Sequence, residues 1–221
     1  MSPRQAPPPQ YDGSPDAFLL PAGARLTRIH SASFSVTDFN PTVARSPLRG
    51  SRFDATPDDQ FGFLYAAGDD ATAVSEVLLR DLPLDQRGAR LLPRARLKNL
   101  RIGWLATNRD LHLVDLRSGR NLAAIGQDTW LTAGPACDYE LTRAWASAIR
   151  AWAPWSSGLT WRSHREPAGF VYVLFEDRMT EACLTEVSTG VPLIDEDRRL
   201  DDGIGRIFVE RLLQTYRVAL I

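Results

Sequence analysis

The chain has 221 residues, of which 44% are hydrophobic and 24% charged, and its formal net charge is −1. This length fits one large domain, and the near-neutral charge excludes a globally basic surface for nucleic acid or anionic lipid. No apolar run approaches the roughly 18 residues of a membrane span, and the N-terminus lacks a signal-peptide pattern. The sequence therefore predicts a cytoplasmic protein that binds neither membranes nor nucleic acid directly.

The residue types also limit the chemistry. Lys98 is the only lysine, so anions must be bound almost entirely by arginine, whose planar fork suits phosphate. The two cysteines form no C-x-x-C pair and the three histidines lie far apart, so no metal site is predicted.

In chain order, residues 1–20 are rich in proline and polar residues and are predicted to be a flexible segment that docks through Phe18–Leu20. Residues 21–221 are predicted to form a single domain. A strand is expected at 25–32, followed by a long loop over 33–51, and loops of that length are often functional.

Residues 61–67 form an apolar run that predicts a buried strand. Asp69 and Asp70 offer N-caps for a helix at about 71–80. Its apolar stripe is expected to comprise Ala73, Val74, Val77 and Leu78. Periodicity alone makes Glu76 an ordinary solvated residue at the edge of this stripe.

The remaining pattern gives strands at 99–108, 111–118, 158–166 and 169–177, with a helix at 139–153. The run at 169–177 is continuously apolar, so this strand is expected at the centre of the sheet. A final helix or strand is expected within 205–221. This order lacks regular βαβ alternation and favours an α+β fold with a largely antiparallel or split sheet.

Neither a Rossmann loop, nor a P-loop, nor a G-x-S-x-G elbow is present. What remains is a set of polar residues at the edges of predicted elements: Arg28, Arg52, Tyr65, Glu76 and Ser163. Taken singly, each has an ordinary structural explanation, such as a surface ion pair or a tyrosine packed in the core.

Taken together, these residues resemble a known family. "GSRFD", "FLYAA" and "TAVSEVLL" are followed, some ninety residues later, by "GLTWRSHRE" and an apolar strand that ends in Leu-Phe. This order and spacing is similar to the RES-domain family, which is named for one arginine, one glutamate and one serine. The resemblance covers about residues 24–178 and places these three at Arg52, Glu76 and Ser163. Arg28 matches the arginine of the opening strand, and Tyr65 matches an aromatic position.

The chain also departs from the family pattern. Ile29 stands where many members have an aromatic residue, and the linker between Arg52 and Tyr65 is longer and more acidic than in short members. Segments 83–135 and 179–221 have no recognisable counterpart.

The resemblance implies an α+β fold of the ADP-ribosyltransferase type, with a split β-sheet core and flanking helices. It implies an enzyme that degrades NAD+ at the nicotinamide–ribose bond, by phosphorolysis or hydrolysis, without a required cofactor; inorganic phosphate would be the second substrate of phosphorolysis. Arg28 and Arg52 would bind the pyrophosphate, Tyr65 would flank nicotinamide, and Glu76 would stabilise the oxocarbenium-like ribose. Ser163 would bind a ribose hydroxyl or a phosphate, or place the nucleophile.

The same resemblance implies a toxin that a helix-turn-helix antitoxin of the Xre type neutralises. Two alternatives stay open: a transferase that moves ADP-ribose to a macromolecule, and a non-catalytic member that binds a nucleotide. Homo-oligomerisation also stays open, since the Trp-rich helix and the apolar end "VALI" suit either an interface or a packed core.

Overall fold

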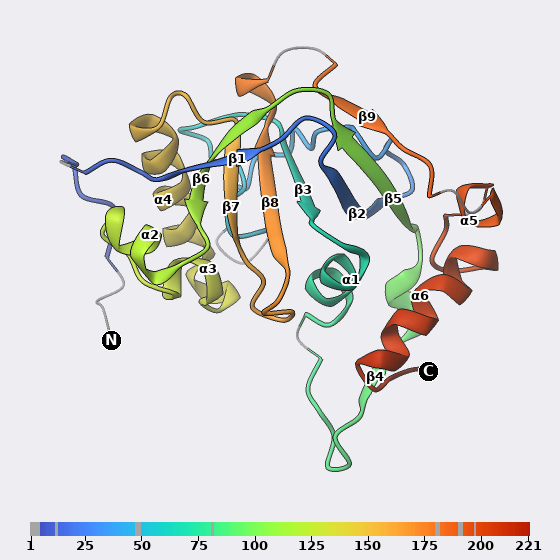
Figure 1. Ribbon diagram of the computed structural model, residues 1–221. Helices are drawn as coiled ribbons and strands as arrows, with labels where there is room; N and C mark the ends of the chain where they lie inside the picture. Colours follow the sequence, from blue (N-terminus) through green and yellow to red (C-terminus); the bar gives the residue numbers. More distant parts are fainter. Residues whose placement is uncertain are drawn as a thin grey trace.

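One curved sheet of eight strands forms the centre of the protein (Figure 1). The computed structural model describes residues 5–11, 13–46, 50–80, 82–179, 182–189, 192–196 and 198–221. The strand order is β1-β6-β7-β8-β3-β2-β5-β9, and every neighbouring pair is antiparallel except β6 and β7. The strands are β1 (Ala17–Leu20), β2 (Arg25–Ser31), β3 (Phe63–Ala67), β5 (Leu100–Thr107), β6 (Leu111–Leu116), β7 (Gly158–Arg162), β8 (Phe170–Phe175) and β9 (Leu184–Glu186).

Helices cover both halves of this sheet. α2, α3 and α4 lie beside β6 and β7, whereas α1 and α6 lie near β2 and β5 (Figure 1). The helices are α1 (Asp70–Leu78), α2 (Gly119–Ala124), α3 (Trp130–Ala133), α4 (Tyr139–Trp152), α5 (Pro192–Glu196) and α6 (Gly203–Thr215). Short 3₁₀ turns are η1 (Arg94–Leu97), η2 (Ala136–Asp138) and η3 (Glu176–Arg178). This α+β architecture confirms the predicted fold class.

The strand β8 is the centre of the core, as its continuous apolar sequence predicts. Val171, Val173 and Phe175 pack on the α4 side, whereas Tyr172 and Leu174 pack on the opposite face. Because both faces of the strand are covered, its sequence shows no polar alternation. A further apolar cluster joins α1, α6 and β5.

The sheet is divided between β2 and β3. These neighbours share a single register pair, Thr27 with Ala67, whereas β2 pairs with β5 over seven residues and β3 pairs with β8 over five. At the far end of β3, Asn40 from the loop after β2 forms an isolated bridge with Phe63. The gap between these two contacts is the place where the candidate site opens.

The N-terminal segment, the long loop after β2 and the C-terminal segment compare with the predictions as follows. Within the predicted flexible segment 1–20, residues 1–4 and 12 lie outside the described residues, and Ala17–Leu20 adds β1 to the edge of β6. In the long loop, residues 47–49 lie outside the described part of the chain. The predicted final helix or strand is present as both, because α6 leads into the short strand β10 (Val218–Leu220).

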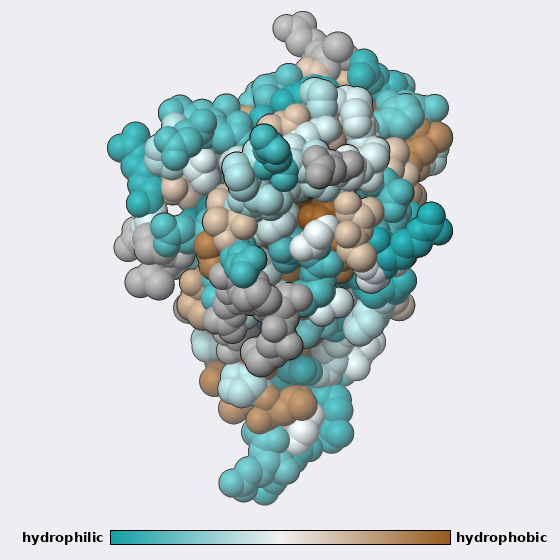
Figure 2. Space-filling view, turned by 90° about the vertical axis from the view of Figure 1, so that its left-hand side faces the viewer, coloured by the Kyte–Doolittle hydropathy of each residue, from teal (hydrophilic) through white to brown (hydrophobic). Residues whose placement is uncertain are grey.

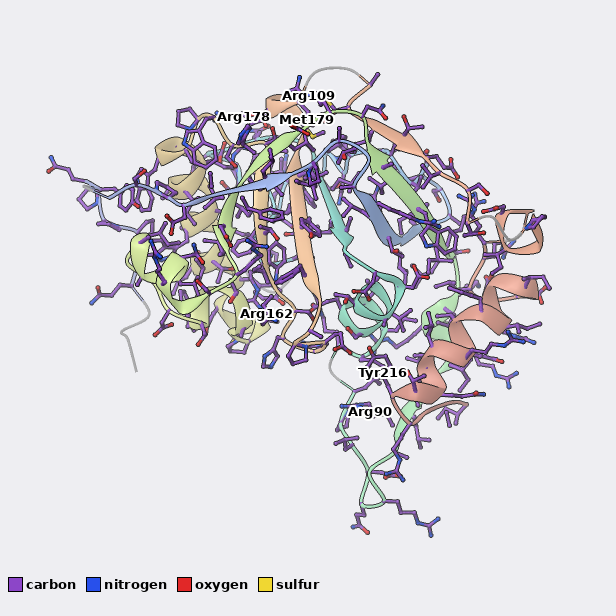
Figure 3. The ribbon with its side chains drawn as sticks, in the orientation of Figure 1. Arg90, Arg109, Arg162, Arg178, Met179 and Tyr216 are labelled. Atoms are coloured by element: carbon purple, nitrogen blue, oxygen red, sulfur yellow. The ribbon has the colours of Figure 1, made fainter. Side chains whose placement is uncertain are left out.

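A projecting arm follows α1. Its strand β4 (Arg90–Leu92) pairs in parallel with β10, and Arg90 lies beside Tyr216, whose carbonyl accepts a hydrogen bond from the Arg90 Nη1 at 3.4 Å (Figure 3). Leu84 and Leu91 are exposed on this arm. Its tip is hydrophilic, and apolar surface gathers at its base (Figure 2). No helix in the described residues combines the length and hydropathy needed to cross a membrane.

Candidate active site

A cavity of about 590 Å³ lies at the division between β2 and β3. This volume is in the range of pockets that bind nucleotide-sized ligands. Its walls come from β2, β3, α1 and the loop after β2, with further residues from α4, β7 and the loop after β7. Among the predicted site residues, the cavity is lined by Arg28, Arg52, Tyr65 and Glu76.

Arg28 fixes one wall of the cavity. Its side chain is almost fully buried in β2, and its Nη1 donates hydrogen bonds to the backbone carbonyls of Val36 at 2.8 Å and Asp38 at 2.7 Å. Burial lowers the pKa of the guanidinium to about 10, while the nearby Asp38 opposes this change. Arg28 therefore keeps its charge at neutral pH and holds the loop after β2 against the cavity.

Arg52 also lines the cavity and is held by backbone carbonyls. Its Nη1 donates to the Leu131 carbonyl at 3.2 Å and its Nη2 to the Gly134 carbonyl at 2.8 Å. The guanidinium also lies 5.0 Å from the centre of the Tyr139 ring, a distance that permits a cation–π contact. Burial is the main cause of its lowered pKa. Because Arg52 also supports the segment between α3 and α4, its replacement by alanine would remove structural contacts as well as a charge.

The Tyr65 hydroxyl fixes the loop that carries Arg52. The Tyr65 hydroxyl donates to Asp54 Oδ1 at 3.0 Å and accepts the backbone N–H of Phe53 at 2.9 Å. Asp54 Oδ2 in turn accepts the Ser51 N–H at 2.6 Å. Burial raises the pKa of both Tyr65 and Asp54 above their ordinary values. Tyr65 lines the cavity, and its hydroxyl holds the loop that carries Arg52.

Glu76 and Ser163 are joined by a hydrogen bond at the wall of the cavity. The Ser163 hydroxyl donates to Glu76 Oε1 at 2.6 Å and accepts the backbone N–H groups of Glu166 at 2.9 Å and Arg165 at 3.2 Å. Ser163 is 2% exposed and is not among the residues that line the cavity, whereas the half-buried Glu76 does line it. Ser163 thus connects the Glu76 carboxylate to the loop after β7.

The comparison of the chain with protein families decides its classification. The family model described as "RES domain" matches residues 25–195, which is most of the chain. The chain belongs to the RES-domain family. The matched range extends beyond residue 178, where the motifs recognised in the sequence end.

Solved structures support the fold of this RES-domain protein. A chain in the crystal structure of the M. tuberculosis MbcT–MbcA toxin–antitoxin complex matches with a TM-score of 0.54 at 14% sequence identity. The match covers 77% of this chain and 84% of that chain, and it confirms the fold of the ADP-ribosyltransferase type. No protein in the search of curated proteins matches.

The RES-domain cavity includes polar residues that sequence reasoning missed. His30, Arg80 and Arg165 line it, and so does Tyr139 under Arg52. Burial lowers the His30 pKa to about 4, with the Arg28 charge adding to the effect, so this imidazole is neutral at pH 7. His30 and Arg80 each lie within four residues of a predicted site residue, which is the signal that could have identified them.

Among the residues that the structure describes, no group of three or more His, Cys, Asp or Glu side chains could hold a metal ion. The cavity instead combines arginine guanidinium groups, one oriented carboxylate and aromatic rings from Tyr65, Tyr139 and Trp161. Such a set can bind an anionic ligand and stabilise positive charge close to it.

Proposed function

We propose that this RES-domain protein degrades NAD+ by cleaving the bond between nicotinamide and ribose. The observation that carries the proposal is the Glu76 carboxylate, which Ser163 holds at the wall of a cavity that Arg28 and Arg52 also line. Departure of nicotinamide leaves positive charge on the ribose, and a fixed carboxylate stabilises that charge as in glycoside cleavage.

The reaction needs no redox partner. Nicotinamide leaves as a neutral molecule and takes the electron pair of the C1″–N bond with it. An oxygen of inorganic phosphate or water then bonds to C1″ and its proton passes to solvent, which gives ADP-ribose-1″-phosphate in the first case and ADP-ribose in the second. The arginines bind the negatively charged portions of the substrate. The aromatic rings shield the reacting ribose from bulk water.

We also propose that the protein is the toxin of a toxin–antitoxin pair, with an Xre-type helix-turn-helix protein as its antitoxin. The support is family membership together with a fold shared with a chain of the M. tuberculosis MbcT–MbcA toxin–antitoxin complex. Loss of NAD+ would give such a toxin its effect. Co-expression with a helix-turn-helix protein encoded beside it should restore growth and cellular NAD+; unchanged growth arrest would contradict this role.

The test is NAD+ consumption by purified wild-type protein, measured with and without inorganic phosphate and with the products separated. Glu76→Gln should abolish consumption, and the matched variant Glu140→Gln, at an exposed position on α4, should not. If Glu76→Gln consumes NAD+ at the wild-type rate, Glu76 is not the catalytic carboxylate. Wild-type protein that consumes NAD+ only when a macromolecular acceptor is present, and labels that acceptor with ADP-ribose, would instead be a transferase. Tight NAD+ binding without any turnover would indicate a non-catalytic member.

A further inference from the structure

We propose that Arg80 binds a phosphoryl group of the ligand beside Glu76, either in the diphosphate of a dinucleotide or in inorganic phosphate. The identity of the ligand rests on the proposed function, but anion binding by Arg80 can be measured separately. Arg28 and Arg52 are the arginines that the sequence motifs identify, and Arg80 is not part of those motifs.

Arg80 is placed by the end of α1. The helix ends at Leu78, Leu79 caps it, and Arg80 occupies the following turn, half-buried at the cavity wall. Arg96 stabilises this turn, because its Nη1 donates to the Arg80 carbonyl at 3.2 Å. The partial negative charge at the C-terminal end of a helix also favours a cation at this position.

The hydrogen bonds of the other two arginines distinguish them from Arg80. Arg28 donates to two backbone carbonyls through Nη1, and Arg52 donates to two through Nη1 and Nη2. Within the described part of the chain, no hydrogen bond or salt bridge joins the Arg80 guanidinium to a carboxylate or a carbonyl, although its charge acts on the nearby Asp54 carboxylate. Its donors are therefore available to a ligand in the cavity.

The charges around Arg80 favour an anion. Arg80 is close enough to Arg52 that its charge contributes to the lowered pKa of Arg52, after the larger effect of burial. Two guanidinium groups of like charge thus share one side of the cavity, and Glu76 already has a hydrogen bond from Ser163. A phosphoryl group, with several anionic oxygens, offsets this repulsion and accepts hydrogen bonds from both arginines.

Equilibrium binding provides the test. Calorimetric titrations of wild type, Arg80→Met, Arg80→Lys and the control Arg94→Met would use three probes: ADP-ribose, inorganic phosphate and adenosine. Arg94 is a suitable control because it is exposed on η1 and does not line the cavity. Arg80→Met should weaken binding of ADP-ribose or phosphate about 10- to 100-fold and leave adenosine binding unchanged. Arg80→Lys should recover part of the loss, since it keeps the charge but not the fork.

Comparing ADP-ribose with inorganic phosphate shows whether Arg80 binds the diphosphate of the dinucleotide or the phosphate that serves as second substrate. Weaker ADP-ribose binding with unchanged phosphate binding assigns Arg80 to the diphosphate, and weaker phosphate binding assigns it to the second substrate. If wild type and Arg80→Met bind ADP-ribose with the same affinity and also bind phosphate with the same affinity, the inference is overturned. It is also overturned if wild type binds neither anion. NAD+ turnover in the same preparations tests the proposed function independently. Arg80-dependent anion binding without turnover would keep the inference and reject that function.

Discussion

Replacement of Ser163 by alanine tests whether this serine positions Glu76 or contacts the substrate. The hydroxyl makes a 2.6 Å hydrogen bond to the Glu76 carboxylate and accepts two backbone N–H groups in the loop after β7. A hydrogen bond to a charged group contributes about 1.5–3 kcal/mol, and unpaired buried N–H groups add to the cost. We therefore expect the free energy of unfolding to fall by roughly 2–4 kcal/mol. This change lowers the melting temperature of a chain of this size by roughly 5–15 °C.

The kinetic assay separates the two roles. If Ser163 acts through Glu76, kcat for NAD+ should fall about 10- to 100-fold with little change in KM, because a mobile carboxylate stabilises the transition state less. Ser163→Thr keeps the hydroxyl and should recover part of kcat. Ser118→Ala is the control, since it removes an exposed N-capping hydroxyl from α2. A rise in KM at constant kcat would show that Ser163 contacts the substrate directly, and unchanged kcat and KM would refute any role in the site.

Three further predictions concern single side chains. Tyr65→Phe should lower the melting temperature by a few degrees and reduce kcat, because the arginine loop loses its hydroxyl link; equal kcat in both proteins would contradict this. Since burial holds the His30 pKa near 4, the unfolded chain binds a proton that the folded protein excludes as pH falls from about 6.5 to 4. Urea titrations should show stability falling over that range, and His30→Asn should reduce the slope; an unchanged slope would argue against a neutral His30. Arg150→Met should lower the urea midpoint without altering NAD+ turnover, because Arg150 pairs with Asp59 and Asp177 away from the cavity. An unaltered midpoint would show that these ion pairs add nothing to stability.

The central strands and the helices α1 and α4 were predictable because their apolar patterns reflect local packing. The helix α4 shows where this reasoning fails. Its 3.6-residue apolar pattern assigns Leu141, Ala144 and Ala148 to the buried face. These three residues are only partly buried, whereas Arg143 and Arg150 are buried. Arg150 lies over the Phe61 ring at 3.6 Å and pairs with carboxylates. Periodicity cannot predict such partners because they come from distant segments of the chain.

Short elements were also missed. The strands β4 and β9 have three residues each, and their positions depend on pairing with β10 and β5 rather than on their own sequence. In the helix α1, Val77 was expected in the core but is exposed at the cavity wall, while Ser75 is fully buried. One face of α1 contributes to the site and the other to the core, so hydropathy alone assigned these residues incorrectly.

The candidate site was identified from the family motifs, and its internal contacts were not. Sequence order predicted that Arg52, Tyr65 and Glu76 would share a site, and the structure brings them to one cavity. The hydrogen bonds of Tyr65 with Asp54 and of Ser163 with Glu76 depend on side-chain geometry across different elements. No spacing rule encodes these contacts.

The division of the sheet has a mechanical consequence. Strands β1, β6, β7, β8 and β3 form one continuous part of the sheet and β2, β5 and β9 form another. Among the residues that the structure describes, Thr27 and Ala67 are the only register pair that joins the two parts. A ligand that contacts both Arg28 in β2 and Tyr65 in β3 links the two parts of the sheet through its own contacts. Occupancy of the cavity should then slow amide hydrogen exchange in both parts together, so that the protein becomes stiffer as a whole when its substrate is bound.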